Sequence, residues 1–344
     1  MAAILVLLAF APPGAGAASP PAPHSNPRHA PRRAIFPVRG VTLGLFYPRD
    51  RQDFEASLDR IAALGATHVS IPIPLRQAGQ IAVEILPEPD LTPPDSLLLL
   101  VTREARRRSL EVLYFPLVNL GDTRPGVWRG TIRPEDWSAW FASYRGRLLH
   151  YARLAGASGA GWLCVGAELV SSEGHRNEWE ALIDSVRAVY PGRLLYSRNW
   201  DTPGALPFAG KLDLVGLNAY FELSARADPP LSELVRKWRR IRAALARRRQ
   251  EGGGRPLLFT EVGYPSSERA AARPWDHDAP RTPRPELQAR CFEAFFRAWR
   301  GAPGVMGGFV YLWSAHEGGA ADPGYSIRGK PAERTIGEWY GDGR

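Results

Sequence analysis

The sequence predicts one (β/α)8 barrel, the α/β fold known as a TIM barrel, with a single catalytic domain. Apolar runs of strand length alternate with amphipathic stretches of helix length, which is typical of βα units that close a parallel sheet. The chain of 344 residues is long enough for one large barrel and short for two enzyme domains. Two of the strand-like runs end on a glutamate, Glu168 and Glu261. In such barrels the carboxyl ends of the strands carry the chemistry, so these glutamates indicate an active site.

The first residues differ in composition from the rest of the chain. An apolar run from Ala2 to Phe10 is too short to span a bilayer, and the small residues up to Ala18 suit a signal peptidase. We therefore expect a signal peptide over residues 1–18, a secreted or periplasmic protein, and no stable membrane insertion. Proline, histidine and arginine dominate residues 19–36, which predicts a disordered spacer. The catalytic domain is expected over residues 37–344.

Eight strands and the helices between them can be placed from the periodicity of apolar residues. Apolar spacing predicts helices from Phe54 to Leu64 and from Trp137 to Tyr151. Residues 202–210 leave room for a turn or two, so the fifth unit should be shortened. The expected strands are Val41 to Phe46, Thr67 to Ile73, Glu111 to Val118, Trp162 to Glu168, Arg193 to Asn199, Leu212 to Tyr220, Pro256 to Val262 and Met306 to Trp313.

The net charge of +9 raises the possibility of a nucleic-acid or anionic-polymer partner. The densest basic run, residues 236–249, overlies a helical apolar period formed by Leu234, Trp238, Ile241 and Leu245. This pattern favours an outer helix with a solvated face, so we expect no nucleic-acid partner, while binding to an anionic polymer stays an alternative.

The sequence holds two cysteines, Cys164 in a predicted strand and Cys291 on the apolar face of a predicted helix. They are expected to be buried thiols because a disulfide would have to cross from the barrel to an outer helix. No spacing of ligands indicates a metal, and the predicted chemistry needs no cofactor.

The residues at and just after the strand ends are polar and aromatic to an unusual degree. Sugars offer hydroxyl groups and apolar C–H faces, so a sugar site needs polar side chains interleaved with aromatic ones. We therefore expect a carbohydrate partner. The candidates are Phe46, Tyr47, Arg76, Gln77, Asn119, Glu168, Asn199, Trp200, Asp201, Asn218, Tyr220, Glu261, Tyr264, Trp313, His316 and Glu317.

Several motifs in order resemble clan A glycoside hydrolases, and most closely glycoside hydrolase family 113, whose founding activity is β-1,4-mannanase. The resemblance spans roughly residues 40–339. Its pieces are Gly40-Val-Thr-Leu-Gly44, Gly166-Ala-Glu168-Leu169, Tyr196-Ser-Arg-Asn199-Trp200, Leu214-Val-Gly-Leu-Asn-Ala-Tyr220, Phe259-Thr-Glu261-Val-Gly-Tyr264 and Gly308-Phe-Val-Tyr-Leu-Trp313.

The resemblance implies a retaining β-glycosidase that acts on β-1,4-mannan or a related β-linked polysaccharide or oligosaccharide by double displacement. Glu168 would be the general acid/base and Glu261 the nucleophile. The phenol of Tyr220 would keep Glu261 ionised, and Trp313 would lie beneath the sugar at the cleavage point. Five more residues are candidates for substrate binding: Asn119, Asn199, Trp200, Asn218 and Tyr264.

Structural alternatives exist for these residues. A glutamate at a strand end can cap a helix or pair with arginine, and Tyr220 and Trp313 can be core aromatics. Asn199 can simply end its strand, and His316 and Glu317 can lie on a loop surface.

Departures from the family pattern leave the substrate open. Ala167 stands where most clan A enzymes have asparagine, and Leu117 stands where family 113 usually has histidine. Residues 71–75 read Ile-Pro-Ile-Pro-Leu where an aromatic residue is expected. A carbohydrate-binding barrel that no longer hydrolyses its ligand is therefore the alternative function.

Overall fold

The computed structural model describes residues 36–122, 124–251, 254–277 and 282–341. The predicted signal peptide and all but the last residue of the predicted spacer lie outside these ranges. Phe36, which we expected to end the spacer, is 2% exposed, and its ring lies 6.3 Å from that of Phe295. The folded part of the chain therefore includes Phe36.

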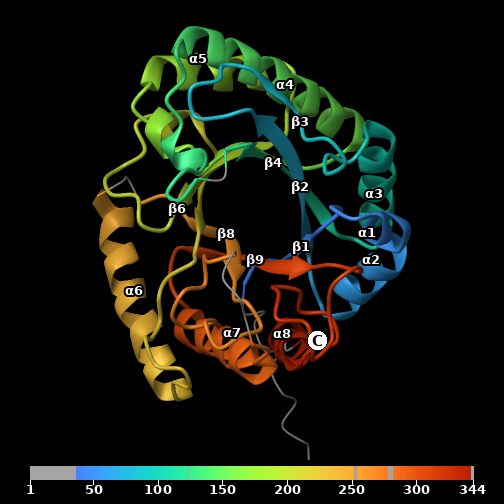
Figure 1. Cartoon of the computed structure of the whole chain (residues 1–344), viewed down its shortest axis with the longest axis vertical. Helices are drawn as coiled ribbons and strands as arrows, with labels where there is room; N and C mark the ends of the chain where they lie inside the picture. Colours follow the sequence, from blue (N-terminus) through green and yellow to red (C-terminus); the bar gives the residue numbers. More distant parts are fainter. Residues whose placement is uncertain (1–35, 123, 252–253, 278–281, 342–344) are drawn as a thin grey trace, which may run out of the picture.

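Eight parallel strands form a closed barrel, because β1 pairs with both β2 and β9 (Figure 1). A short strand, β3 (Ile85–Pro87), pairs antiparallel with the end of β2 outside the ring. The predicted (β/α)8 fold is confirmed. The barrel strands are β1 (Val38–Leu43), β2 (His68–Gln77), β4 (Glu111–Leu120), β5 (Trp162–Ala167), β6 (Arg193–Asn199), β7 (Leu214–Asn218), β8 (Leu257–Gly263) and β9 (Val305–Trp313).

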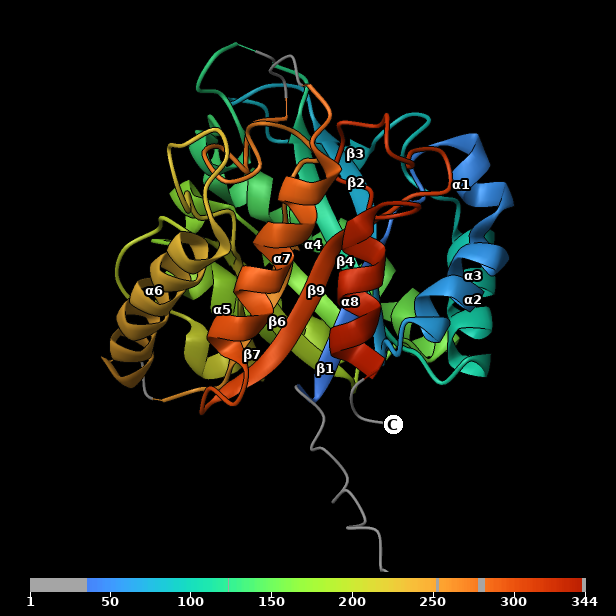
Figure 2. The same ribbon diagram turned by 90° about the horizontal axis from the view of Figure 1, so that it is seen from below.

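Helices surround the barrel, and the loops that follow the strands gather at one of its ends (Figure 2). The fifth unit has only the 3-10 turn η3 (Ala209–Lys211), as its short sequence predicted. The sequence did not predict β3 or the short helix α1 (Pro48–Gln52). The other helices are α2 (Phe54–Ala63), α3 (Asp95–Arg107), α4 (Trp137–Ser158), α5 (Arg176–Arg187), α6 (Leu231–Glu251), α7 (Pro285–Trp299) and α8 (Pro331–Gly341).

Apolar side chains fill the barrel at the end where the strands begin. Val38, Leu113, Trp162, Leu214 and Leu258 belong to one buried cluster, and each lies near the start of its strand. A larger cluster fills the layer between the strands and the helices. Strands of a parallel barrel are buried on both faces, which explains their nearly continuous apolar sequences. The polar residues near the strand ends are thus left to form the opposite, open end.

The basic run on α6 packs as its apolar period predicted. Leu234, Trp238, Ile241 and Leu245 are buried against the barrel layer. Cys164 and Cys291 are buried free thiols, as expected. In the part of the chain that the structure describes, no helix combines the length and the apolar character that a membrane crossing requires.

Candidate active site

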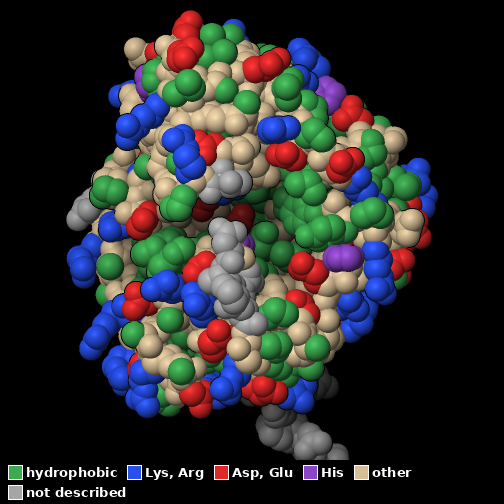
Figure 3. All heavy atoms as spheres, viewed as in Figure 1, with side chains coloured by type: hydrophobic (Ala, Val, Ile, Leu, Met, Phe, Trp, Pro, Cys, Tyr) green, Lys and Arg blue, Asp and Glu red, His purple; other side chains and the backbone are tan. Residues whose placement is uncertain are grey.

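Glu168 and Glu261 come from two strands of the barrel that are separated by β6 and β7. Glu168 follows β5 directly and Glu261 lies in β8, and their exposed fractions are 7% and 8%. Their charges act on each other, since the charge of Glu168 raises the pKa of Glu261. Figure 3 shows a hollow at the centre of this end of the barrel, with acidic side chains deep inside it. The two carboxyl groups therefore share one site.

The backbone at Glu168 has a conformation that is uncommon for a residue with a side chain. Its φ is 57°, in the left-handed region, where strained residues often mark functional sites. The peptide N–H of Glu168 donates to the carbonyl of Ser197 on β6 (2.8 Å). Two residues earlier, a Cβ at Gly166 would approach Trp179 and Tyr196 to 2.8 Å, so only glycine fits there. These contacts fix the turn that presents Glu168.

Arg129 joins Glu168 to the neighbouring strand. It begins the 3-10 turn η1 (Arg129–Thr131), in the loop that follows β4. One guanidinium N–H donates to Glu168 Oε2 (2.9 Å), a second to Asn119 Oδ1 (3.0 Å), and Nε–H donates to the carbonyl of Val118 (2.7 Å). Three different acceptors thus fix the orientation of the guanidinium group, and its bond to the Glu168 carboxylate is charge-assisted.

Our sequence interpretation did not include Arg129. The residue lies outside the periodic elements, so neither strand nor helix spacing marks it. The only signal was its position in a loop that follows a barrel strand, where active-site residues of this fold come from.

Tyr220, just after β7, donates its phenolic O–H to Glu261 Oε2 over 2.5 Å. Burial and the charge of Glu168 raise the pKa of Glu261 to about 8, while the Tyr220 hydrogen bond and the charge of Arg129 lower it. The expected contact between Tyr220 and Glu261 is therefore present, but burial outweighs its effect in the free protein. Glu261 therefore keeps its proton to a higher pH than an ordinary carboxyl group does.

Two asparagines among the candidates lie near the carboxylate pair. Asn119 accepts a hydrogen bond from Arg129, which binds Glu168. Asn218 pairs in register with Glu261 across β7 and β8 and is 1% exposed. Its side-chain oxygen accepts a hydrogen bond from the hydroxyl of Ser197 (2.8 Å). Both are therefore polar groups of the same barrel end.

Asn199 and Trp200, at the end of β6, make contacts of their own. The amide of Asn199 donates to the carboxylate of Asp201 (2.6 Å). Trp200 stacks on Trp275, with ring centroids 5.4 Å apart, and touches Phe221 at the same distance. Trp200 also packs against the buried cluster that contains Tyr220.

Tyr264 and Trp313 lie in the packed layer outside the barrel, which corrects our expectation that they face the sugar. The phenol of Tyr264 accepts a hydrogen bond from Trp238 Nε1 on α6 (3.1 Å), and the residue is fully buried. Side chains alternate along a strand, so a residue three positions after Glu261 points to the other face.

Trp313 is also fully buried, with the guanidinium of Arg60 on α2 5.2 Å above its ring. Phe309 points into the barrel, and regular alternation would place Trp313 on the same face four residues later. The register between β1 and β9 shifts after Val310, so Trp313 points to the other face. Tyr311 instead lies beside the site, with its ring 6.3 Å from that of Tyr220.

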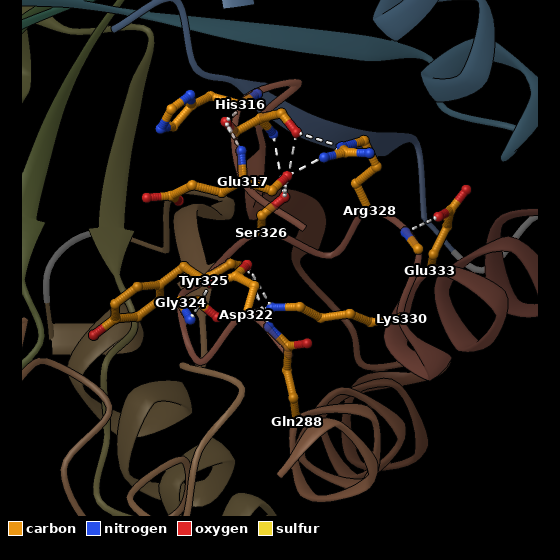
Figure 4. A network of polar contacts seen from close by, with 12 residues as sticks. Gln288, His316, Glu317, Asp322, Gly324, Tyr325, Ser326, Arg328, Lys330 and Glu333 are labelled. Carbon is orange, nitrogen blue, oxygen red and sulfur yellow. Dashed lines mark hydrogen bonds and ion pairs between the residues drawn. The ribbon is translucent and has the colours of Figure 1, made fainter. Parts of the chain in front are cut away.

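The loop that follows β9 carries Tyr325 to the site and is held by a polar network (Figure 4). Lys330 is buried, donates to the carbonyl of Gly324 (3.1 Å) and pairs with Asp322 (2.9 Å). The ring of Tyr325 lies 6.4 Å from that of Tyr220 and 5.7 Å from that of Tyr311.

The start of the same loop is fixed by α1, which follows the neighbouring strand β1. Asp50 on α1 accepts hydrogen bonds from the hydroxyl of Ser314 (2.7 Å) and from the peptide N–H groups of Ala315 (2.6 Å) and His316 (2.9 Å). Glu317 is half-buried, and burial together with the charges of Asp322 and Asp50 raises its pKa. Figure 4 shows Glu317 and His316 pointing away from Arg328. Among the described residues, no cluster of acidic, histidine or cysteine side chains could hold a metal ion.

Comparisons with known proteins place this site in a family. The model of Glycoside Hydrolase Family 113 matches residues 47–330. The GH113 β-mannanase AaManA from Alicyclobacillus acidocaldarius, solved in complex with ManMIm, is 28% identical. The match covers 90% of this chain and 98% of that one, with a TM-score of 0.77.

A complex structure of a GH113 β-1,4-mannanase is 24% identical, covers 89% and 99% of the two chains, and has a TM-score of 0.75. A GH5_18 variant from Streptomyces cattleya is 17% identical, covers 84% and 74%, and has a TM-score of 0.56. These two show the fold. No curated protein sequence matches the chain. The chain belongs to Glycoside Hydrolase Family 113, and it is an O-glycoside hydrolase of clan A.

Proposed function

We propose that this hydrolase cleaves β-1,4-mannan, or a related β-linked polysaccharide or oligosaccharide, with retention of configuration. The observation that carries the proposal is the buried pair of carboxyl groups, one bonded to Arg129 and the other to Tyr220. Two carboxyl groups on one sugar site supply the acid and the nucleophile of a double displacement, which works with a separation of about 5–5.5 Å.

In the first step, Glu168 donates a proton to the glycosidic oxygen while a carboxylate oxygen of Glu261 attacks the anomeric carbon. The bond between that carbon and the glycosidic oxygen breaks, the leaving sugar keeps the electron pair, and Glu261 becomes an ester of the remaining sugar.

In the second step, ionised Glu168 takes a proton from water as the water oxygen attacks the same carbon. The ester bond breaks, Glu261 leaves as a carboxylate, and Glu168 is again protonated.

The proton on the pair must reside on Glu168 when the reaction begins. In the free protein, Arg129 bonds Glu168 and the pKa of Glu261 is raised to about 8. Substrate that inserts its glycosidic oxygen next to Glu168 would compete with Arg129 for that carboxyl group. Arg129 also bonds Asn119, so its guanidinium keeps an anchor when it is displaced. The hydrogen bond from Tyr220 favours the ionised form of Glu261 that the attack requires.

The solved GH113 structures named β-mannanase support mannan as the first substrate to test. Ala167 and Leu117 differ from the residues expected in the family, so glucomannan and aryl β-glycosides belong in the same assay.

The decisive experiment compares the wild type with Glu168→Gln and Glu261→Gln on these substrates. Each variant should lose on the order of a thousandfold in rate, and nuclear magnetic resonance of the first product should show the β-anomer. Matched surface controls are Glu180→Gln and Glu293→Gln. Full activity in both site variants would reject the assignment.

A carbohydrate-binding barrel without turnover is the second candidate, since the ion pair with Arg129 occupies the proposed acid. It predicts that the wild type binds manno-oligosaccharides in calorimetry, that Glu261→Ala retains the affinity, and that no substrate is cleaved.

We also propose that the protein is exported, because an apolar run and a small-residue segment begin the sequence. Expression of the full chain should yield a product outside the cytoplasm that has lost about 18 residues. A product of full mass in the cytoplasm would contradict this.

A further inference from the structure

Trp275, in the segment between β8 and α7, is the one tryptophan among the large apolar residues that the described part of the chain exposes, at 39%. Its ring is held in place because it stacks on Trp200, with 5.4 Å between the ring centroids and an angle of 29° between the ring planes. An aromatic side chain buries a large apolar area when covered, so its exposure needs a reason.

The segment that bears Trp275 is tied to the candidate active site. Tyr325 donates its phenolic O–H to the carbonyl of Pro274 (2.5 Å), and its ring lies 4.8 Å from that of His277. The ring of Tyr220, the partner of Glu261, lies 6.4 Å from that of His277. Trp200 packs against the same cluster as Tyr220 and Tyr325. Contacts therefore run without interruption from the catalytic carboxylate to the exposed indole of Trp275.

The topology places this indole along the course of a bound chain. A sugar chain that is cleaved between Glu168, after β5, and Glu261, on β8, must pass between these two strands. One end of the chain then leaves the barrel mouth over the strands between β5 and β8, and the other end leaves over the remaining strands. β6 and β7 are the strands between β5 and β8 on the shorter way around the barrel. Trp200 directly follows β6, and Phe221 lies just after β7. Trp275 stacks on Trp200. Hydrophobic side chains flank the hollow on both sides in Figure 3.

We propose that Trp275, supported by Trp200, is a platform that stacks a sugar ring beyond the cleavage point of a β-linked oligosaccharide. The flat indole matches the apolar C–H face of a pyranose, while the sugar hydroxyl groups stay in water. Asp201, exposed beside Trp200, can accept hydrogen bonds from those hydroxyl groups. This inference rests on the proposed function, and it makes the enzyme selective for chains long enough to reach Trp275.

The test compares two substrates in the active full-length protein, mannohexaose and 4-nitrophenyl β-mannoside. Trp275→Ala should lower kcat/KM for mannohexaose about tenfold more than for the aryl mannoside, mainly through KM, because a stacked ring contributes binding energy only to the longer chain. Productive cleavage fixes the position of each substrate, so the comparison does not depend on binding elsewhere.

Trp275→Phe and Trp275→Tyr keep an aromatic face and should recover most of the loss. Trp339→Ala is the matched control, because Trp339 stacks on Phe296 of α7, away from the barrel mouth. It should show no dependence on chain length. Equal effects of Trp275→Ala on both substrates, or no effect, would overturn the platform. If the wild type cleaves neither substrate, the proposed function fails instead, so the two failures are distinguishable.

Discussion

Arg129 donates a guanidinium N–H to the carboxylate of Glu168 over 2.9 Å, so the candidate acid is ion-paired in the free protein. The side chain of Glu168 is 9% exposed and that of Arg129 is 22% exposed, so water screens the pair weakly. The same positive charge also lowers the pKa of Glu261. One residue therefore influences both members of the pair, and the pH dependence of the reaction should reveal it.

Arg129→Met should move the alkaline limb of the pH profile to higher pH. The mechanism that we propose needs one proton on the two carboxyl groups, and Glu261 keeps its proton until pH rises through its raised pKa of about 8. Removal of the positive charge raises that pKa further, so activity should persist to higher pH while its maximum falls. The measurement is kcat/KM between pH 4 and 10.

Arg124→Met is the control, because Arg124 lies in the same loop and pairs with Asp122 at the surface. Its profile should match the wild type. An alkaline limb at the same pH in Arg129→Met would show that the guanidinium does not act on the pair.

Tyr220→Phe should lower kcat on the order of a hundredfold, comparable to the loss of one donor to a developing or resident negative charge in an active site. The phenol bonds Glu261 over 2.5 Å, and the phenylalanine ring preserves the contacts with Tyr311 and Tyr325. Without the donor, the pKa of Glu261 should rise, since the hydrogen bond lowers it.

Tyr264→Phe removes a phenol that bonds Trp238 outside the barrel. This variant should lose about 1 kcal/mol of stability and keep its kcat. Steady-state kinetics and thermal unfolding of both variants separate the two roles. A catalytic defect in Tyr264→Phe that equals the defect in Tyr220→Phe would contradict the assignment.

The sequence predicted the strands well because period and length mark them, and it indicated Glu168, Glu261 and Tyr220 as site candidates because they stand at or just after strand ends. The roles that we propose for them came from the family resemblance. The sequence did not predict the direction in which some of the candidate side chains point. Tyr264 lies an odd number of residues after Glu261 and turns outward, and the shifted register of β9 buries Trp313 outside the barrel. The direction of Tyr264 follows from simple alternation along the strand, whereas that of Trp313 depends on a register shift that local sequence does not mark.

Arg129 and Trp275 were missed for a different reason. Both lie in loops that fold back over the barrel mouth, where no period constrains the position of a residue. Their contacts with Glu168 and Trp200 join residues 39 and 75 positions apart in the chain, so only the folded structure brings each pair together.

Glu261→Gln should stabilise the protein at neutral and alkaline pH. The folded pKa of about 8 exceeds the ordinary value of 4.5, so the folded state retains a proton that the unfolded chain releases. The contribution of this carboxyl group to wild-type stability is therefore fully present below pH 4.5 and is lost as pH rises through about 8. Glutamine does not titrate, so the stability of the variant lacks this dependence on pH.

The difference in free energy of unfolding between Glu261→Gln and the wild type should be small near pH 4.5 and reach the order of a few kcal/mol near pH 8. Urea unfolding at both pH values measures it. Glu180→Gln, in a surface pair with Arg176, should give the same small difference at both. A constant difference for Glu261→Gln would show that its carboxyl group is ionised throughout.

Lys330→Met should weaken both the fold and the site. The ammonium group is buried, pairs with Asp322 and donates to the carbonyl of Gly324, next to Tyr325 (Figure 4). Its removal leaves the Asp322 carboxylate without this partner, which should lower the free energy of unfolding by about 1–3 kcal/mol. Because Tyr325 packs against Tyr220, kcat should fall as well.

The double variant Lys330→Met/Asp322→Asn removes the uncompensated charge and should recover part of the stability, whereas the surface control Lys211→Met should change neither quantity. If the double variant is as unstable as the sum of the single ones, Lys330 and Asp322 are not coupled, and other contacts, such as those of Asp50 and Arg328, hold the loop.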